Sequence, residues 1–378
     1  MKAWPIVAIL VIQAILLLGH WFVYSTFIAF CPGLAPAIAA DLRVALLILA
    51  FSFVFASLLS FRYSNPVVRA IYWTAAVWLG FVNFFFWGSV VLRVAWLAIV
   101  FSHVGANPGD FRAPLAGVIY GLAAVTAAYG LLNARIIRIR RVAVKIPNLP
   151  ASWRGRRAVL MSDLHLGAIN GVRFCRRVVA AASQLQPDVV FIPGDLFDGT
   201  KGDLDQLLAP FHALKPPLGV FFSTGNHEEF TSAAHYIEAI AKAGIRVLAN
   251  EQVVLDGLRI AGVLYHDSSS PLHMKAALSS MGPAGTEAVG AFPGILLNHA
   301  PARLPIVEQA GFNLQLSGHT HGGQFLPFTW ITRRVYGRFT SGLHSFGSLE
   351  VYTSTGAGTW GPPMRVGTRP EIILLEFS

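Results

Sequence analysis

The chain has 378 residues, of which 54% are hydrophobic and only 13% are charged, and its mean hydropathy is +0.56. This composition excludes a disordered chain and an ordinary soluble protein. Two cysteines, Cys31 and Cys175, are too few for a disulfide framework or a cysteine-rich zinc module.

The net charge of +10 is concentrated in one short segment. Residues 1–134 carry +4, residues 135–157 carry +8, and residues 158–378 carry −2. A basic segment between an apolar half and a mildly acidic half is typical of a juxtamembrane region and not of a nucleic-acid-binding surface. We therefore expect the lipid bilayer to be a partner of this chain, and nucleic acid not to be one.

Residues 1–134 are predicted to form a transmembrane anchor. A helix that rises 1.5 Å per residue needs about 20 apolar residues to cross roughly 30 Å of hydrocarbon. Four stretches qualify, at about residues 5–24, 42–61, 70–92 and 115–134. The apolar stretch Val94–Phe101 is too short for another crossing and is interpreted as an interfacial helix, with a fifth span near residues 94–103 as the weaker alternative.

The distribution of Lys and Arg predicts the orientation of these spans. In a four-span arrangement, Lys2, Arg62, Arg69 and the cluster from Arg135 to Lys145 fall on one side, and Arg43, Arg93 and Arg112 fall on the other. Because positively charged loops stay in the cytoplasm, we expect a multi-pass protein of the inner membrane with a cytosolic C-terminal half. The spans hold few ionisable groups, which favours an anchor over a channel or transporter.

The C-terminal half is predicted to be a basic linker, residues 135–156, followed by an α/β domain, residues 157–378. Apolar runs of strand length alternate there with helical patterns. The helices are expected near residues 172–184, 204–213, 232–243 and 302–309, and two late β-rich segments near 349–354 and 371–377.

Five of the apolar runs end in turns that carry potential metal ligands. The turns are Ser162-Asp163-Leu164-His165, Gly194-Asp195-Leu196-Phe197-Asp198, Gly225-Asn226-His227-Glu228, Asn298-His299 and Gly318-His319-Thr320-His321. Because strands of an open α/β sheet deliver their carboxyl-end loops to one crevice, these side chains should converge. A mixed oxygen and nitrogen set suits two divalent cations such as Mn²⁺, Fe or Zn²⁺ better than Ca²⁺ or a structural zinc ion.

These blocks, in this order, resemble the calcineurin-like metallophosphoesterase superfamily, with its D-x-H, G-D-x-x-D, G-N-H-[DE], H and G-H-x-H motifs. The resemblance covers about residues 157–378 and implies an αββα sandwich with mixed sheets. The N-terminal spans and the string SGHTHGGQ, residues 317–324, are similar to a membrane-anchored bacterial branch.

The resemblance also implies a role for each residue of the centre. The first metal would be held by Asp163, His165 and His321, the second by Asn226, His299 and His319, and Asp195 would bridge both. A hydroxide shared by the two cations would attack phosphorus, and His227 would protonate the leaving group. Glu228 would orient the His227 ring, and Asp198 would tune His165. The implied reaction is the metal-dependent hydrolysis of a phosphoester.

The substrate class is predicted from the segment that follows the last motif. Residues 322–339 mix aromatic side chains with Arg333, Arg334 and Arg338, a composition that suits an anionic lipid surface. The alternative is that the aromatic residues are core and the arginines face water. We expect a lipid-linked phosphoester or pyrophosphate, and His266 is a candidate substrate contact. The competing functions are a phosphatase for soluble nucleotides or phosphoproteins that its spans only localise, and a non-catalytic membrane scaffold or receptor.

Overall fold

The computed structural model describes residues 4–102, 108–230, 233–282 and 292–378. The chain forms two compact units, one of residues 1–132 with 361–364 and one of residues 133–360 with 365–378, and each is described by itself.

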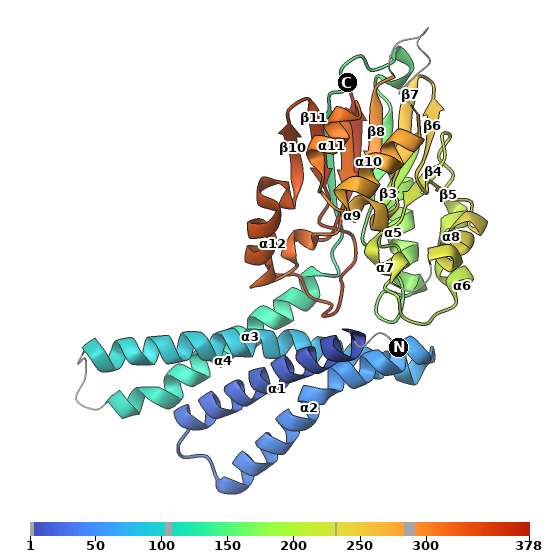
Figure 1. Ribbon diagram of the computed structural model, residues 1–378. Helices are drawn as coiled ribbons and strands as arrows, with labels where there is room; N and C mark the ends of the chain where they lie inside the picture. The colour runs from blue at the N-terminus through green and yellow to red at the C-terminus, as the bar shows by residue number, and fades with distance from the viewer. Residues whose placement is uncertain (1–3, 103–107, 231–232, 283–291) are drawn as a thin grey trace. The chain divides into compact units, whose positions relative to one another are not determined.

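The N-terminal unit is helical (Figure 1). Within the described residues, four helices are long and apolar enough to cross a membrane. They are α1 (Trp4–Phe30), α2 (Pro36–Arg62), α3 (Pro66–Ser102) and α4 (Arg112–Asn133), the last preceded by the short 3₁₀ helix η1 (Pro108–Phe111). These helices correspond to the four predicted spans. Many of their large apolar side chains face outward, as expected for helices that meet lipid.

The predicted interfacial helix at Val94–Phe101 is wrong, because α3 continues through Arg93 to Ser102. The guanidinium of Arg93 has partners on helix α1, and the helix α3 can therefore continue through this residue. Its Nε donates to Thr26 Oγ1 at 2.7 Å, and its guanidinium lies 5.3 Å from the ring centre of Phe22. A separate fifth span is likewise not formed by residues 94–102, and residue 103 lies outside the described residues.

The few polar side chains of the helical unit find partners inside it. Gln13 Nε2 donates to the Ala50 carbonyl at 3.1 Å, and Trp78 Nε1 donates to His20 Nε2 at 2.9 Å. Because polar groups in hydrocarbon need such partners, these contacts account for both residues without a transport role.

The C-terminal unit holds two mixed sheets, each of six strands among the described residues. The first has the order β1-β12-β2-β3-β4-β5, with β1 Arg138–Val144, β2 Arg157–Leu160, β3 Val189–Pro193, β4 Val220–Ser223, β5 Arg246–Val247 and β12 Glu371–Phe377. The second has the order β10-β11-β9-β8-β7-β6, with β6 Glu251–Leu255, β7 Leu258–Gly262, β8 Gly294–Leu297, β9 Leu314–Ser317, β10 Gly342–Phe346 and β11 Leu349–Thr353.

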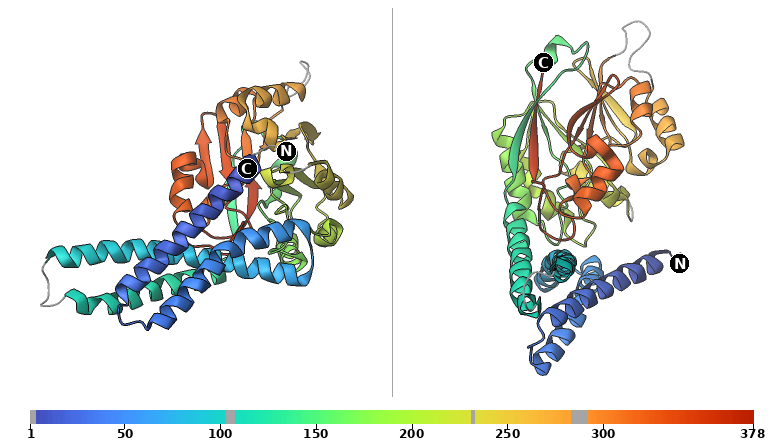
Figure 2. Two further views of the ribbon diagram at one scale, coloured as in Figure 1. Left: turned by 60° about the horizontal axis from the view of Figure 1, so that its bottom comes forward. Right: turned by 90° about the vertical axis from the view of Figure 1, so that its left-hand side faces the viewer.

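The two sheets pack face to face and are covered by helices on their outer sides (Figure 2). Leu160 and Phe191 of the first sheet share one buried core with Ile295 and Leu316 of the second. Helices α5 (Val172–Gln184), α6 (Leu204–Leu208) and α8 (Ala233–Lys242) cover the first sheet, and α10 (Pro271–Ser280) and α11 (Leu304–Gln309) cover the second. This arrangement confirms the predicted αββα sandwich.

Residues 135–156 are not simply the basic linker that was predicted. They contain β1, whose residues from Arg138 to Val144 pair in parallel with β12, and a 3₁₀ turn, η2 (Ala151–Trp153), whose Trp153 is fully buried. Because β1 lies at the sheet edge, its arginines stay in water while Val144 packs inward, and the run of charges hides the strand pattern.

Candidate metal centre

The five ligand-bearing turns follow the carboxyl ends of β2, β3, β4, β8 and β9 and meet at one end of the sandwich. Five of the seven predicted ligand residues are buried there, and Asn226 and His319 are partly buried. Three groups of ligand atoms in this region, each within 4.8 Å of one another, are Asp163–His165–His321, His165–Asp195–His227 and Asp195–His299–His319. Parallel strands at the centre of each sheet therefore bring together residues separated by up to 158 positions, from Asp163 to His321.

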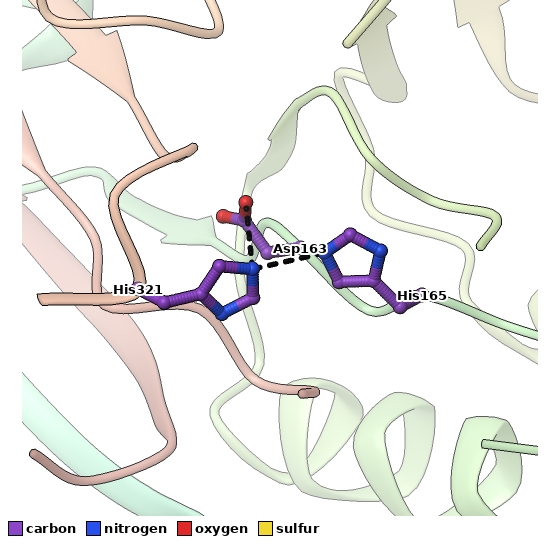
Figure 3. Close-up of side chains that lie close together, drawn as sticks. All are labelled: Asp163, His165 and His321. Carbon is purple, nitrogen blue, oxygen red and sulfur yellow. Dashed lines mark hydrogen bonds and ion pairs between the residues drawn. The ribbon is translucent and has the colours of Figure 1, made fainter. Parts of the chain in front are cut away.

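Asp163, His165 and His321 form one side of the centre, which we call the Asp163 half-site (Figure 3). The Nε2 atoms of His165 and His321 lie 2.9 Å apart, and His321 Nε2 lies 3.7 Å from Asp163 Oδ1. Burial lowers the pKa of both imidazoles well below its usual range. A lowered pKa favours the neutral ring, which is the form in which histidine binds a metal.

Asn226, His299 and His319 form the other side, the His299 half-site. His299 Nε2 lies 3.1 Å from Asn226 Oδ1 and 3.2 Å from His319 Nδ1. The Nδ1–H of His299 donates to the Pro193 carbonyl at 2.8 Å, which leaves Nε2 to face the other two side chains. A carbonyl in this position orients a histidine and raises its basicity as a metal ligand.

Asp195 lies between the two half-sites. Its Oδ2 is 3.1 Å from His299 Nε2 and 3.7 Å from His165 Nε2, while Oδ1 accepts the backbone N–H of His227 at 3.0 Å. This is the position that a bridging carboxylate requires, although the ligand role itself stays a prediction.

The chemistry of these side chains fits a pair of cations. Asp163 Oδ2 is buried and has no hydrogen-bond partner among the described residues, and burial raises the pKa of this carboxyl. Carboxylate oxygens, an amide oxygen and imidazole nitrogens are crowded together in this small region. A buried carboxylate in such surroundings needs a positive partner, which two divalent ions would provide.

The backbone of the centre is held in an uncommon conformation. Asp163, His165, Asp195, His319 and His321 have φ values of 52°, 47°, 51°, 69° and 50°, in the left-handed region. Such residues carry strain that the surrounding structure must hold in place, and they cluster at functional sites.

Two glycines of the motifs are explained by close packing against the carboxylates. A Cβ at Gly225 would lie 2.2 Å from Asp195 Oδ1, and a Cβ at Gly318 would lie 2.2 Å from Asp163 Oδ2. Any side chain at these positions would displace a predicted ligand.

Glu228 has a different role from the predicted one. Its carboxylate accepts the backbone N–H groups of Asp195, Phe197 and Gly225 at 3.0, 3.0 and 2.8 Å, and it does not orient the His227 ring. Burial raises the pKa of Glu228 to about 7. Glu228 therefore connects the turn after β3 to the turn after β4. It lies on the short helix α7 (Asn226–Glu229), which directs its side chain to the backbone of both turns.

Asp198 likewise does not touch His165. Its side chain accepts the Thr200 N–H at 2.7 Å and the Ala168 N–H at 3.1 Å and so closes the loop after β3. Its backbone carbonyl, 3.0 Å from His227 Nδ1, orients the His227 ring. Since a carbonyl only accepts, Nδ1 carries the hydrogen and Nε2 is left for chemistry.

Arg365 is a residue of the centre that sequence reasoning missed. Its guanidinium is fully buried; Nη1 donates to the His321 carbonyl at 2.8 Å, and Nη2 lies 3.0 Å from His321 Nδ1. Burial lowers its pKa to about 10. The contact is 44 residues away in sequence. The available signal was an arginine in a segment rich in glycine and proline, with Arg369 as the other arginine before the last strand.

Aromatic residues around the centre were also missed. The Tyr265 ring centre lies 5.8 Å from those of His299 and His319, while Phe230 and Trp360 lie 4.6 and 5.9 Å from His227. His266, next to Tyr265, is exposed and lies beside Asp267 and His273 rather than among the predicted ligands, and a role in substrate contact stays a prediction.

Comparison with known proteins agrees with this geometry. Residues 156–323 match the calcineurin-like phosphoesterase family. A transmembrane protein with metallophosphoesterase domain from Danio rerio is 34% identical over 279 residues, which are 70% of this chain and 62% of the relative. Uncharacterized metallophosphoesterases from Campylobacter jejuni and Aquifex aeolicus are 27% and 30% identical, over 87% and 68% of this chain and 89% and 98% of their own length. The chain thus spans less than two thirds of the zebrafish relative and most of the two bacterial ones.

Proposed function

The chain belongs to the calcineurin-like metallophosphoesterase family, and from this premise we propose that it is a membrane-anchored phosphoesterase with a dinuclear metal centre. The observation that carries the proposal is that Asp195 Oδ2 lies 3.7 Å from His165 of the Asp163 half-site and 3.1 Å from His299 of the other half-site. The Asp163 half-site would hold one ion and the His299 half-site the other.

The division of labour follows from the positions of the side chains. When bound, two divalent cations supply an activated hydroxide and neutralise charge on the phosphoryl oxygens. His227 is held by the Asp198 carbonyl with Nε2 free to carry a second proton, and it donates that proton to the leaving oxygen. Burial lowers the pKa of His227, which makes its protonated form a stronger acid.

We place the domain on the cytosolic side of the inner membrane and propose a lipid-linked phosphoester or pyrophosphate as substrate. The four apolar helices support membrane insertion. The side chains of Phe230 and Trp360 next to His227 are 61% and 58% exposed, which gives an apolar leaving group a surface to contact. Soluble phosphoesters and a non-catalytic scaffold are the competing functions.

The test is His227→Ala in the full-length protein, with His212→Ala, an exposed histidine of the same domain, as the matched control. We expect His227→Ala to keep two metal ions per chain by elemental analysis while turnover falls about 10²- to 10⁴-fold, the usual contribution of a general acid. The substrates are lipid phosphoesters in mixed micelles, aryl phosphodiesters and nucleotides, each with Mn²⁺ and with Zn²⁺.

Turnover of the soluble compounds alone would refute the lipid substrate. No turnover of any compound by protein with two ions would refute the enzyme and favour the scaffold.

A further inference from the structure

Helix α12 (Phe328–Tyr336) presents an apolar edge to the outside of the C-terminal unit. Trp330 and Val335 are 65% and 66% exposed, and Leu326, Phe328 and Ile331 are between 42% and 49% exposed. We call these five side chains the α12 edge. Large apolar residues gathered on one short helix mark an interaction surface more often than scattered ones do.

The opposite face of α12 is fixed to the metal centre. Thr340 Oγ1 donates to the Thr332 carbonyl at 3.1 Å, and the Tyr336 ring centre lies 6.2 Å from that of His319. A Cβ at Gly323, in the turn that begins with His321, would lie 2.3 Å from the backbone of Thr329. The helix is therefore packed tightly on the turn that carries two predicted ligands, and its exposed edge is a property of the folded domain.

The charged residues on and next to α12 are all positive. Arg333 and Arg334 lie on α12 and Arg338 on the following turn, and all three are exposed. From His321 to Leu349 the sequence contains no Asp or Glu. Exposed apolar side chains and arginines together on one short helix are the pattern of a helix that lies in the headgroup region of an anionic membrane.

The exposed aromatic residues at His227 continue this surface toward the centre. Gln324, which precedes the α12 edge, exchanges two hydrogen bonds with the backbone of Trp360, at 3.0 and 3.1 Å. Trp360 in turn lies 5.9 Å from His227 by ring centres. The buried Gln324 side chain thus connects the segment before α12 to Trp360, which lies beside the predicted general acid.

We propose that α12 is an interfacial helix: the α12 edge inserts into an anionic lipid bilayer, and Arg333 and Arg334 bind its headgroups. The bilayer is favoured over a protein partner because this chain carries four apolar helices and the arginines match anionic lipid in charge. The inference rests on the proposed membrane anchoring and deepens it, since it names the surface that takes a headgroup phosphoester from the membrane.

The experiment measures insertion and not turnover, so that its failure is distinct from failure of the phosphoesterase proposal. The full chain with Cys31→Ser and Cys175→Ala is reconstituted in nanodiscs, and an environment-sensitive fluorophore is attached at Trp330→Cys or Val335→Cys. Leu272→Cys on α10, which is 73% exposed, is the matched control. We expect a blue shift and quenching by spin-labelled lipid at 330 and 335 in phosphatidylglycerol discs, and neither at 272.

Charge reversal tests the headgroup contact. Arg333→Glu with Arg334→Glu should reduce lipid quenching at position 330, whereas Arg246→Glu with Lys275→Glu, both exposed elsewhere on the domain, should not. Unchanged metal content verifies that each variant is folded. The proposal is overturned if the probe at 330 behaves like the probe at 272. It is also overturned if the probe at 330 is blue-shifted in the nanodiscs but is not quenched by spin-labelled lipid, because the edge is then covered by protein.

Discussion

The two half-sites of the metal centre use similar ligands but support them in opposite ways. In the His299 half-site, Nδ1 of His299 donates to a carbonyl, and although burial alone would lower its pKa, the Asp195 carboxylate raises it to about 9. In the Asp163 half-site, Nδ1 of His321 faces the Arg365 guanidinium, which together with burial lowers the pKa of this ring. A carbonyl strengthens a histidine as a donor, whereas a cation weakens it. On the Arg365 side, the carboxylates of Asp163 and Asp195 therefore have to offset a positive charge that the other half-site lacks.

Removing the shared charge should abolish the distinction between the half-sites. Asp195→Asn keeps the shape and the acceptor for the His227 N–H but loses the carboxylate that both sides use. We expect loss of both ions and of all measurable turnover, the largest effect of any single substitution. Elemental analysis after dialysis is the measurement, with the exposed Asp205→Asn as control. Retention of one tightly held ion would show that Asp195 serves only one half-site.

The substitution Arg365→Met tests the difference between the half-sites directly, because Arg365 contacts only the Asp163 half-site. The guanidinium holds the His321 carbonyl, the His321 ring and, at 2.6 Å, the Gly358 carbonyl. Its loss removes a positive charge beside His321 but also frees the turn that carries this ligand. We expect the second effect to dominate, so that one of the two ions binds about 10- to 100-fold more weakly, as is usual for residues that position a ligand. A chelator titration should resolve one shifted and one unshifted phase.

The control is Arg259→Met, another buried arginine, whose Nη2 donates to the Ala310 and Gly311 carbonyls at 3.2 Å in the second sheet. If both ions weaken equally in Arg365→Met, or if Arg259→Met has the same effect, Arg365 only stabilises the fold and the asymmetry does not exist.

The sequence was sufficient for features that depend on residue type and position along the chain. Asp163, His299 and their partners lie where strands end, so the common edge of parallel strands brings them together. The direction in which a side chain points could not be predicted from the sequence. Glu228 is adjacent to His227, but its carboxylate accepts hydrogen bonds from the backbone of Asp195 and Phe197.

Contacts between distant segments account for the remaining differences. Arg93 looked like the end of a span because Thr26, its partner on another helix, is 67 residues away. The basic run around Arg140 looked like a linker because β12, which pairs with it, is formed by the last residues of the chain. In each case the deciding contact joins segments that are far apart in the sequence.

Asp198 lies outside both half-sites, and its substitution should have the smallest effect on the metal centre. Burial raises the pKa of its carboxyl to about 6 despite the hydrogen bonds from Thr200 and Ala168. An unfolded chain releases this proton near pH 4, so between about pH 4 and 6 the native state binds more protons and loses stability as the pH rises, by about 3 kcal/mol for a shift of about two units. Asp198→Asn cannot titrate, and Thr200 Oγ1 still accepts the Ala168 N–H at 3.0 Å. Its thermal midpoint should therefore fall less than that of the unsubstituted protein between pH 4.5 and 7, while both ions stay bound. Parallel midpoint curves for the two proteins would contradict a raised pKa, and loss of an ion would place the Asp198 side chain within a half-site.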